Sequence, residues 1–191
     1  MKIDKSIIGS FVLLVIIASL YRIMPGRPLG FAPQIAMALF SGSIIKDKKF
    51  SFLLPILSML VSDIIYEVLF RFNITSVMGF YEGQLLNYVL FGALTVIGFW
   101  IKKENLLHIA GGSIAGASFY FILSNFIVWI GGGLGIDNLP YARSWDGLMK
   151  CYSEGIPFYL GSLVATVFFS GVLFGGYFLL NKYAIRKQVI A

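Results

Sequence analysis

The chain has 191 residues, of which 58% are hydrophobic and 13% are charged, with a mean hydropathy of +0.85 and a formal net charge of +6. Soluble domains carry roughly 25% charged residues, so this composition excludes a soluble fold of this size. The basic residues lie in short runs between apolar segments, which argues against a nucleic-acid-binding face. One cysteine and one histidine exclude an internal disulfide and a multi-histidine metal site within one chain.

Apolar segments predict an all-α integral membrane protein with six transmembrane helices in a single domain, residues 1–191. A bilayer-crossing helix needs roughly 20 mainly apolar residues. The first segment follows Lys2 and Lys5 but lacks a clean cleavage site, so it is predicted to be a retained span rather than a signal peptide. The second is short and is the weakest of the six. The predicted spans are residues 6–21, 31–45, 50–70, 83–101, 106–130 and 156–180.

The distribution of Lys and Arg predicts that both termini are cytoplasmic. With that orientation, ten of the 15 basic residues lie in inner segments and five in outer ones. An even number of spans agrees with this orientation. The predicted location is therefore the bacterial inner membrane, with the loop after the fifth span, residues 131–155, on the outer side.

The predicted spans carry most of their polar residues in the outer half. Asp63 lies about 10–12 Å below the outer end of the third span, and Glu67 follows at i+4 on the same face. An ionisable group inside the membrane is costly unless it is paired or hydrated, so it is a functional-site candidate by default. Arg22, Arg27, Arg71 and Arg143 are outer-side cations available to these carboxylates.

Further polar and aromatic residues lie at a similar depth on other spans or in the long outer loop. Each also has a structural interpretation, as interhelical hydrogen bonding, as an aromatic belt at the headgroups or as a membrane-surface helix. Ser144 is a candidate cap for a short helix over residues 144–150. The predicted substrate-binding residues are Asp63, Glu67, Gln84, Asn87, Asn125, Trp129, Trp145 and Tyr152.

Small-residue pairs in apolar sequence predict close helix contacts. They are Gly112 with Gly116, Gly171 with Gly175 and Ala32 with Ala36, and Ser162, Thr166 and Ser170 form a stripe at i, i+4 and i+8.

Several segments resemble a family of small bacterial membrane proteins of unknown function. The most specific are Ser124-Asn-Phe-Ile-Val-Trp129 and Gly147-Leu-Met-Lys-Cys-Tyr152, supported by residues 31–42, 60–63 and 156–158. That family is similar to the substrate-binding S components of energy-coupling factor (ECF) vitamin transporters. The resemblance implies six helices, an outward-facing substrate site closed by loops, and work with a coupling subunit and ATPases. The small-residue docking motif of S components usually lies on the first helix, which is bulky here.

The sequence is therefore compatible with three functional hypotheses. The leading hypothesis is a substrate-binding membrane subunit for uptake of a vitamin or other small solute. The alternative is a non-transporting scaffold of the cell envelope, in which the polar residues are structural. A membrane-embedded enzyme has few catalytic groups available, because no P-loop, metal cluster or activated nucleophile is evident. No cofactor and no metal is predicted.

Overall fold

The computed structural model describes the backbone of residues 5–190 and the side chains of residues 9–182. These residues form six helices of 11 residues or more and one four-residue helix, without a β-strand. The elements in chain order are α1 (Lys5–Ile23), α2 (Gln34–Ile44), α3 (Lys48–Ser51), α4 (Leu53–Arg71), α5 (Gln84–Gly98), α6 (Leu106–Ile130) and α7 (Trp145–Ile190).

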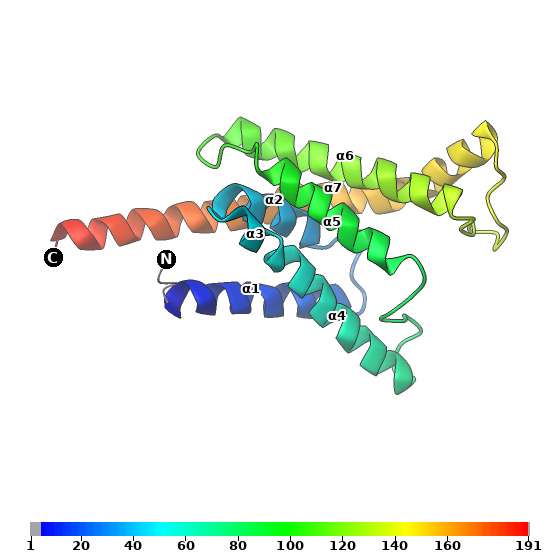
Figure 1. The fold of residues 1–191 in the computed structure, drawn as a ribbon, viewed down its shortest axis with the longest axis horizontal. Coiled ribbons are helices and arrows are strands. Elements are labelled where there is room, and N and C mark those ends of the chain that lie inside the picture. The colour runs from blue at the N-terminus through cyan, green and yellow to red at the C-terminus, as the bar shows by residue number, and fades with distance from the viewer. Residues whose placement is uncertain (1–4, 191) are drawn as a thin grey trace.

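The long helices run alternately in opposite directions, so that their connections alternate between two ends of the bundle (Figure 1). The α1–α2, α4–α5 and α6–α7 connections lie at one end, which is the end predicted to be outside. The α2–α3 and α5–α6 connections lie at the other end, together with the start of α1 and the end of α7. This alternation is the arrangement that the predicted spans required.

Local sequence explains where several helices begin. The Asp47 side chain accepts a hydrogen bond from Lys49 N at 3.1 Å and caps α3. Asn105 Oδ1 accepts from Leu107 N and His108 N at 2.9 and 3.2 Å and caps α6. Each cap satisfies N–H groups that have no partner within the helix.

Helix α2 is the core of the bundle. Its residues from Gln34 to Gly42 are all buried, and Leu39 is fully buried. Gly42 and Gly98 face each other where α2 crosses α5, and a Cβ on either would collide with the backbone of the other helix. The absence of side chains at these two positions therefore allows α2 and α5 to pack directly.

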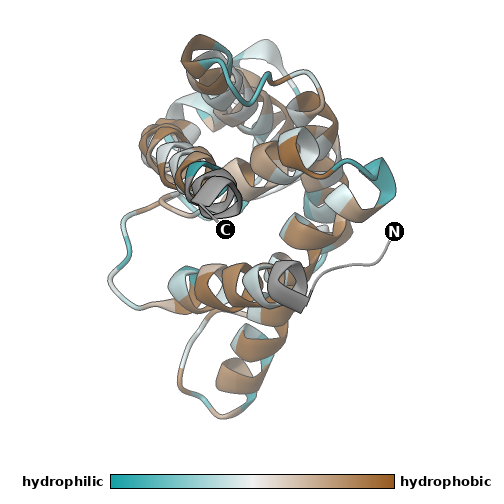
Figure 2. Cartoon of the chain, turned by 90° about the vertical axis from the view of Figure 1, so that its left-hand side faces the viewer, coloured by the Kyte–Doolittle hydropathy of each residue, from teal (hydrophilic) through white to brown (hydrophobic). Residues whose placement is uncertain are grey.

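The exposed surface of the helices differs from that of a soluble protein, and several polar side chains are buried. Large apolar side chains are exposed along the helices, as at Leu13 and Phe168, whereas Ser58, Thr95 and Thr166 are fully buried. In Figure 2 much of the helical ribbon has the hydrophobic colour, and the hydrophilic colour lies mainly in the connections and at helix ends. Lipid, rather than water, suits such a surface.

Three helices are long and apolar enough to cross a membrane: Lys48–Arg71, Leu106–Ile130 and Trp145–Lys182. The apolar segments Gly9–Ile23, Gln34–Ile44 and Gln84–Gly98 are shorter. The chain is therefore an all-helical membrane protein, and six full spans are not clearly present. The expected weakness of the second span is reproduced, because α2 has only 11 residues.

The last helix begins earlier than predicted. Ser144 Oγ accepts from Gly147 N at 3.2 Å, as expected of a cap, but the helix then continues from Trp145 through Pro157 to Ile190. The predicted surface helix over residues 144–150 is thus the first two turns of α7 rather than a separate element.

The small-residue pairs divide into two groups. Gly116 lies against Leu39 and Gly112 against Ile101, so both serve packing within the bundle. The Ser113 hydroxyl of α6 donates to Ser170 on α7 at 2.9 Å. By contrast, a Cβ at Gly171 or Gly175 would meet no described atom within 4 Å.

Candidate functional site

A cavity of about 340 Å³ lies where six helices and two connections converge near the predicted outer end. Its lining comes from every helix except α3. The lining residues are Arg22, Arg27, Pro28, Leu29, Gly30, Ala32, Gln34, Ile35, Met59, Tyr81, Asn87, Phe91, Tyr120, Phe158 and Ser162. Ligand cavities in proteins typically measure roughly 300–1,000 Å³, so this one suits a small solute.

The α1–α2 connection closes one side of the cavity and is fixed to α7. Ser162 Oγ donates to Gly30 O at 3.1 Å. Gly30 has φ +69°, and a Cβ there would collide with Phe158 O. Gly161 approaches Leu29 O just as closely from the helix side. Glycine is needed at position 30 for both its backbone conformation and its contact.

The same connection brings Arg27 to the cavity. Its Nη1 donates to Phe31 O at 2.8 Å, which folds the connection over its own last residues. The connection therefore has an internal tie as well as an attachment to α7.

Beside the cavity, Asp63 on α4 is the centre of a buried polar cluster. The carboxylate is 1% exposed and forms an ion pair with Arg22 on α1. Gln84 Nε2 donates to its Oδ2, and Tyr88 OH donates to the same oxygen at 2.7 Å. Tyr66 OH donates in turn to Arg22 O at 2.9 Å. The buried charge is thus paired and fully hydrogen-bonded, which is the condition for keeping it in an apolar interior.

A second polar chain lies on the cavity wall. Asn87 Nδ2 donates to Tyr81 Oη, and Tyr120 OH donates to Asn87 Oδ1 at 3.1 Å. Tyr81 accepts this bond, so its own O–H has a hydrogen left to donate. Partial burial raises the pKa of the Tyr81 phenol, which keeps that hydrogen in place at neutral pH.

Two buried polar atoms of the lining residues have no hydrogen-bond partner among the described atoms: Gln34 Oε1 and Arg27 Nε. Gln34 is only 3% exposed, and its Nε2 donates to Ala18 O at 3.4 Å. The amide nitrogen therefore has a partner and the amide oxygen has none. Buried polar groups almost always have a partner, and an exception indicates that a water, an ion or a ligand binds there. These two atoms are the strongest sign of ligand binding in the described part of the chain.

The eight predicted site residues fall into separate places. Asn87 lines the cavity, whereas Asp63 and Gln84 lie next to it in the Arg22 cluster. Glu67 lies further out, where its Oε1 accepts from Arg71 Nε at 2.8 Å and its Oε2 from Phe80 N at 3.4 Å. The expected pairing of outer arginines with the two carboxylates is therefore confirmed for Arg22 and Arg71.

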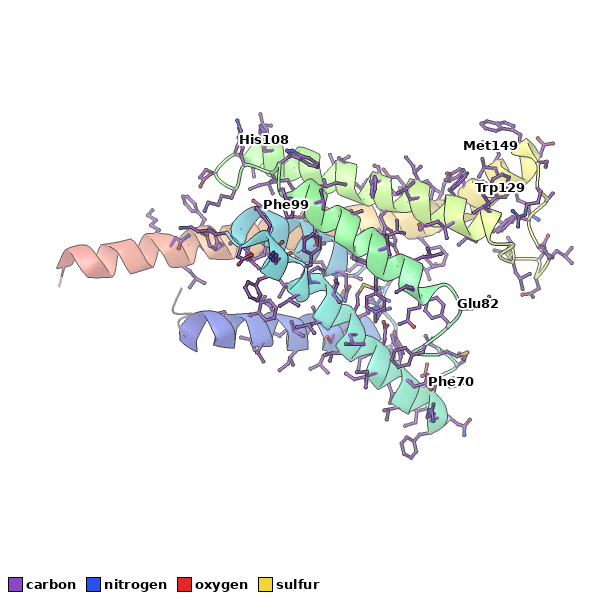
Figure 3. All side chains as sticks on the ribbon, viewed as in Figure 1. Phe70, Glu82, Phe99, His108, Trp129 and Met149 are labelled. Atoms are coloured by element: carbon purple, nitrogen blue, oxygen red, sulfur yellow. The ribbon has the colours of Figure 1, made fainter. Side chains whose placement is uncertain are left out.

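The other four residues belong to the junction of α6 and α7 and do not line the cavity. Trp129 Nε1 donates to Ala142 O at 2.8 Å, and Tyr152 OH donates to Ile122 O at 3.0 Å. Asn125 Nδ2 donates to Phe121 O, and Trp145 is 70% exposed. Figure 3 shows Trp129 and Met149 at this junction, away from Glu82 and Phe70 at the ends of α5 and α4. These four predicted site residues are not among the lining of the cavity beside Asp63.

Charged groups secure the α6–α7 connection itself. Tyr141 OH donates to Glu154 Oε2 at 2.7 Å, and Lys150 Nζ donates to Asp137 Oδ2 at 2.6 Å. The Lys150 ammonium lowers the pKa of the Asp137 carboxyl, and burial with the Glu154 bond raises the pKa of the Tyr141 phenol. These contacts stabilise the conformation of the loop, and none of the four residues lines the cavity.

Sequence reasoning missed Gln34 and the tyrosines of the wall as site residues. Gln34 carried a usable signal, because it is the one amide in an otherwise apolar segment that follows Pro33. Tyr81 and Tyr120 carried none, since tyrosine is common in membrane helices and at their ends.

A comparison with protein families decides where the chain belongs. The model of a family of unknown function, DUF6580, matches residues 3–188. The chain is a member of DUF6580. Neither the curated proteins nor the solved structures gave a match. Membership in DUF6580 agrees with the expected family of unknown function and assigns no activity.

Proposed function

We propose that this DUF6580 protein is a membrane-embedded substrate-binding subunit for uptake of a small solute, such as a vitamin or another micronutrient. The observation that carries the proposal is the cavity of about 340 Å³ with Gln34 Oε1 and Arg27 Nε unpartnered at its lining. A ligand that supplied one donor and one acceptor would satisfy both atoms.

The shape of the molecule supports this function. The lining comes from six helices, so a bound solute would contact most of the bundle at once. The gate in this proposal is the α1–α2 connection, which covers the cavity and is held to α7 by the Ser162–Gly30 hydrogen bond and by Phe31 against Phe168 and Phe169. Opening there would admit a solute without unpacking α2.

The proposed setting is the bacterial inner membrane, with both termini in the cytoplasm and the cavity near the outer face. Ten of the 15 basic residues support this orientation. The likeness to ECF S components adds a separate transmembrane coupling subunit and ATPases, since this chain has no P-loop. Ala32 and Ala36 are poor docking residues for such a subunit, because Ala32 lines the cavity and Ala36 is fully buried.

A ligand screen tests the proposal. Purified full-length protein in detergent is heated with vitamins and other small metabolites, each in excess. A ligand present at 100 times its Kd stabilises the folded state by about 2.7 kcal/mol, which raises the unfolding midpoint by several degrees. Gln34→Met should abolish this rise, and Tyr177→Phe, at the other end of the bundle, should preserve it. The absence of stabilisation by any compound would overturn the proposal.

The alternative scaffold function has one observation in its favour. Asp63, the deepest carboxylate, has all its charge and hydrogen-bonding needs met inside the protein. A scaffold would need this cluster only for stability. Co-purification with cell-envelope proteins and without an ATPase, by a chain that binds no solute, would favour the scaffold.

A further inference from the structure

The charges around the cavity are unbalanced. Arg22 and Arg27 are the only charged residues of the lining, and no carboxylate is among them. Arg22 is neutralised by Asp63, whereas Arg27 has no ion pair among the described side chains. One positive charge in the cavity lining is therefore left without a counter-charge.

The start of α2 adds to this positive character. Gln34 and Ile35 are its first two residues, and both line the cavity. The first N–H groups of a helix have no partner within it, and the helix dipole places partial positive charge there. Helix starts of this kind bind carboxylates and phosphates readily. The buried Gln34 Oε1, which has no hydrogen-bond partner among the described atoms, is an independent sign of a polar ligand at the same helix start.

The rest of the lining restricts the body of the ligand. Met59, Phe91, Tyr120 and Phe158 supply an apolar and largely aromatic wall, with the Phe91 and Tyr120 ring centroids 5.3 Å apart. A doubly charged phosphate would meet one uncompensated arginine in surroundings too apolar to hydrate the second charge. A carboxylate on an apolar body fits the same lining with its single charge matched.

We infer that the solute is a small monocarboxylate with an apolar, preferably aromatic body and one N–H or O–H donor. Arg27 Nε and the first turn of α2 bind the carboxylate, and Gln34 Oε1 accepts the donor hydrogen. Tyr81 O–H is a second donor at the rim. This inference rests on the proposed function and adds the chemical class of its solute.

Pairs of ligands with the same body, one with and one without a carboxylate, measure the contribution of the negative charge to binding. Purified full-length protein in lipid nanodiscs is titrated calorimetrically at pH 7.5 with 4-aminobenzoate and 4-aminobenzamide, and with indole-3-acetate and indole-3-acetamide. Each pair shares its body and its donor and differs in the negative charge. Benzylamine supplies the cation. At least one acid should bind ten times more tightly than its amide, and benzylamine should not bind.

Substitutions at Arg27 and Gln34, with one control, test which residues cause the preference for the acid over its amide. Arg27→Gln should bring the affinity for the acid down to that for the amide, and Arg27→Lys should restore part of it. Arg143→Gln, which removes another arginine predicted to lie at the outer end, should leave the tenfold preference intact. Gln34→Met should weaken acid and amide alike, because both carry the donor.

The outcomes distinguish this inference from the proposed function. Amides or benzylamine binding as tightly as the acids, or both acids failing to bind, would overturn the monocarboxylate assignment. A neutral or cationic metabolite found in the broader screen would leave the solute-binding function in place. Should Arg27→Gln not yield folded protein, the acid–amide ratio of the unaltered chain alone decides.

Discussion

The Asp63 cluster and the neighbouring cavity both hold buried polar atoms and lie at the same end of the bundle, yet they differ in one respect. Asp63 has an arginine, an amide and a tyrosine bound to it, so every need of its charge is met by the protein. Gln34 and Arg27 each keep one atom unpartnered. A buried charge by itself thus indicates a structural anchor as readily as a binding site, and the unsatisfied atom is the better indicator of a ligand.

The largest effect expected is from loss of the anchor. Asp63→Asn leaves the Arg22 guanidinium, which is 20% exposed, without its counter-charge and should lower the free energy of unfolding by about 3 kcal/mol. Unfolding in mixed detergent micelles measures it. The double variant Arg22→Gln, Asp63→Asn should be more stable than the sum of the two single losses predicts. An unchanged unfolding midpoint in Asp63→Asn together with lost ligand binding would reverse the roles of the two regions.

A smaller effect is expected where the connection covers the cavity. Gly30→Ala forces a side chain into a backbone with φ +69° and against Phe158 O, and should cost about 2 kcal/mol and speed proteolysis of the connection. Gly26→Ala is the matched control, because Gly26 has φ +75° but open surroundings. Its cost should be about 1 kcal/mol. Equal costs for the two variants would show that the contact with α7 contributes nothing.

Removal of an unpartnered atom should hardly affect stability. Gln34→Met keeps the volume, deletes an acceptor that has no partner and removes one long hydrogen bond, from Nε2 to Ala18 O at 3.4 Å, so the free energy of unfolding should change by less than about 1 kcal/mol. Ligand-induced stabilisation should nevertheless disappear. A loss of stability as large as that of Asp63→Asn would make Gln34 a second anchor rather than a ligand contact.

The smallest effect belongs to the exposed α6–α7 connection. Lys150 lowers the pKa of the Asp137 carboxyl, so the contribution of this pair is present above the ordinary pKa of 3.8 and is lost as the pH falls through the lowered value. The unfolding midpoints of the unaltered chain and Asp137→Asn should therefore differ slightly at pH 7, and the difference should shrink as the pH falls below 3.8. A constant difference across this range would contradict the pairing.

The sequence predicted much of the fold because membrane spans follow from local hydropathy. The predicted span over residues 106–130 coincides with α6, and that over residues 50–70 lies within Lys48–Arg71. The start of α7 was placed 11 residues too late, since polar residues near Lys150 made its first turns resemble a loop. Hydropathy measures contact with lipid, and a helix that extends beyond the lipid loses that signal.

Part of the candidate site was predictable and part was not. Depth in the membrane singled out Asp63, Gln84 and Asn87, which do lie together on α4 and α5. Predicted depth in the membrane also selected Asn125 and Trp129, which lie at the junction of α6 and α7 and not at the cavity. Depth gives the position of a residue along the membrane normal only. Which helices are neighbours within the membrane is decided by their packing.

The sequence by itself determined that this is a helical membrane protein, how its charges divide between two ends, and which polar residues lie deep. These properties depend on each residue and its near neighbours, because transfer into lipid is a local free energy. The tertiary structure decided that Arg22, among four arginines predicted to lie on the outer side, neutralises Asp63, and that Gln34 and Arg27 keep unpartnered atoms at one cavity. Those outcomes depend on distances between residues far apart in the chain, which are set by the packing of α1 against α4 and of α2 against its neighbours.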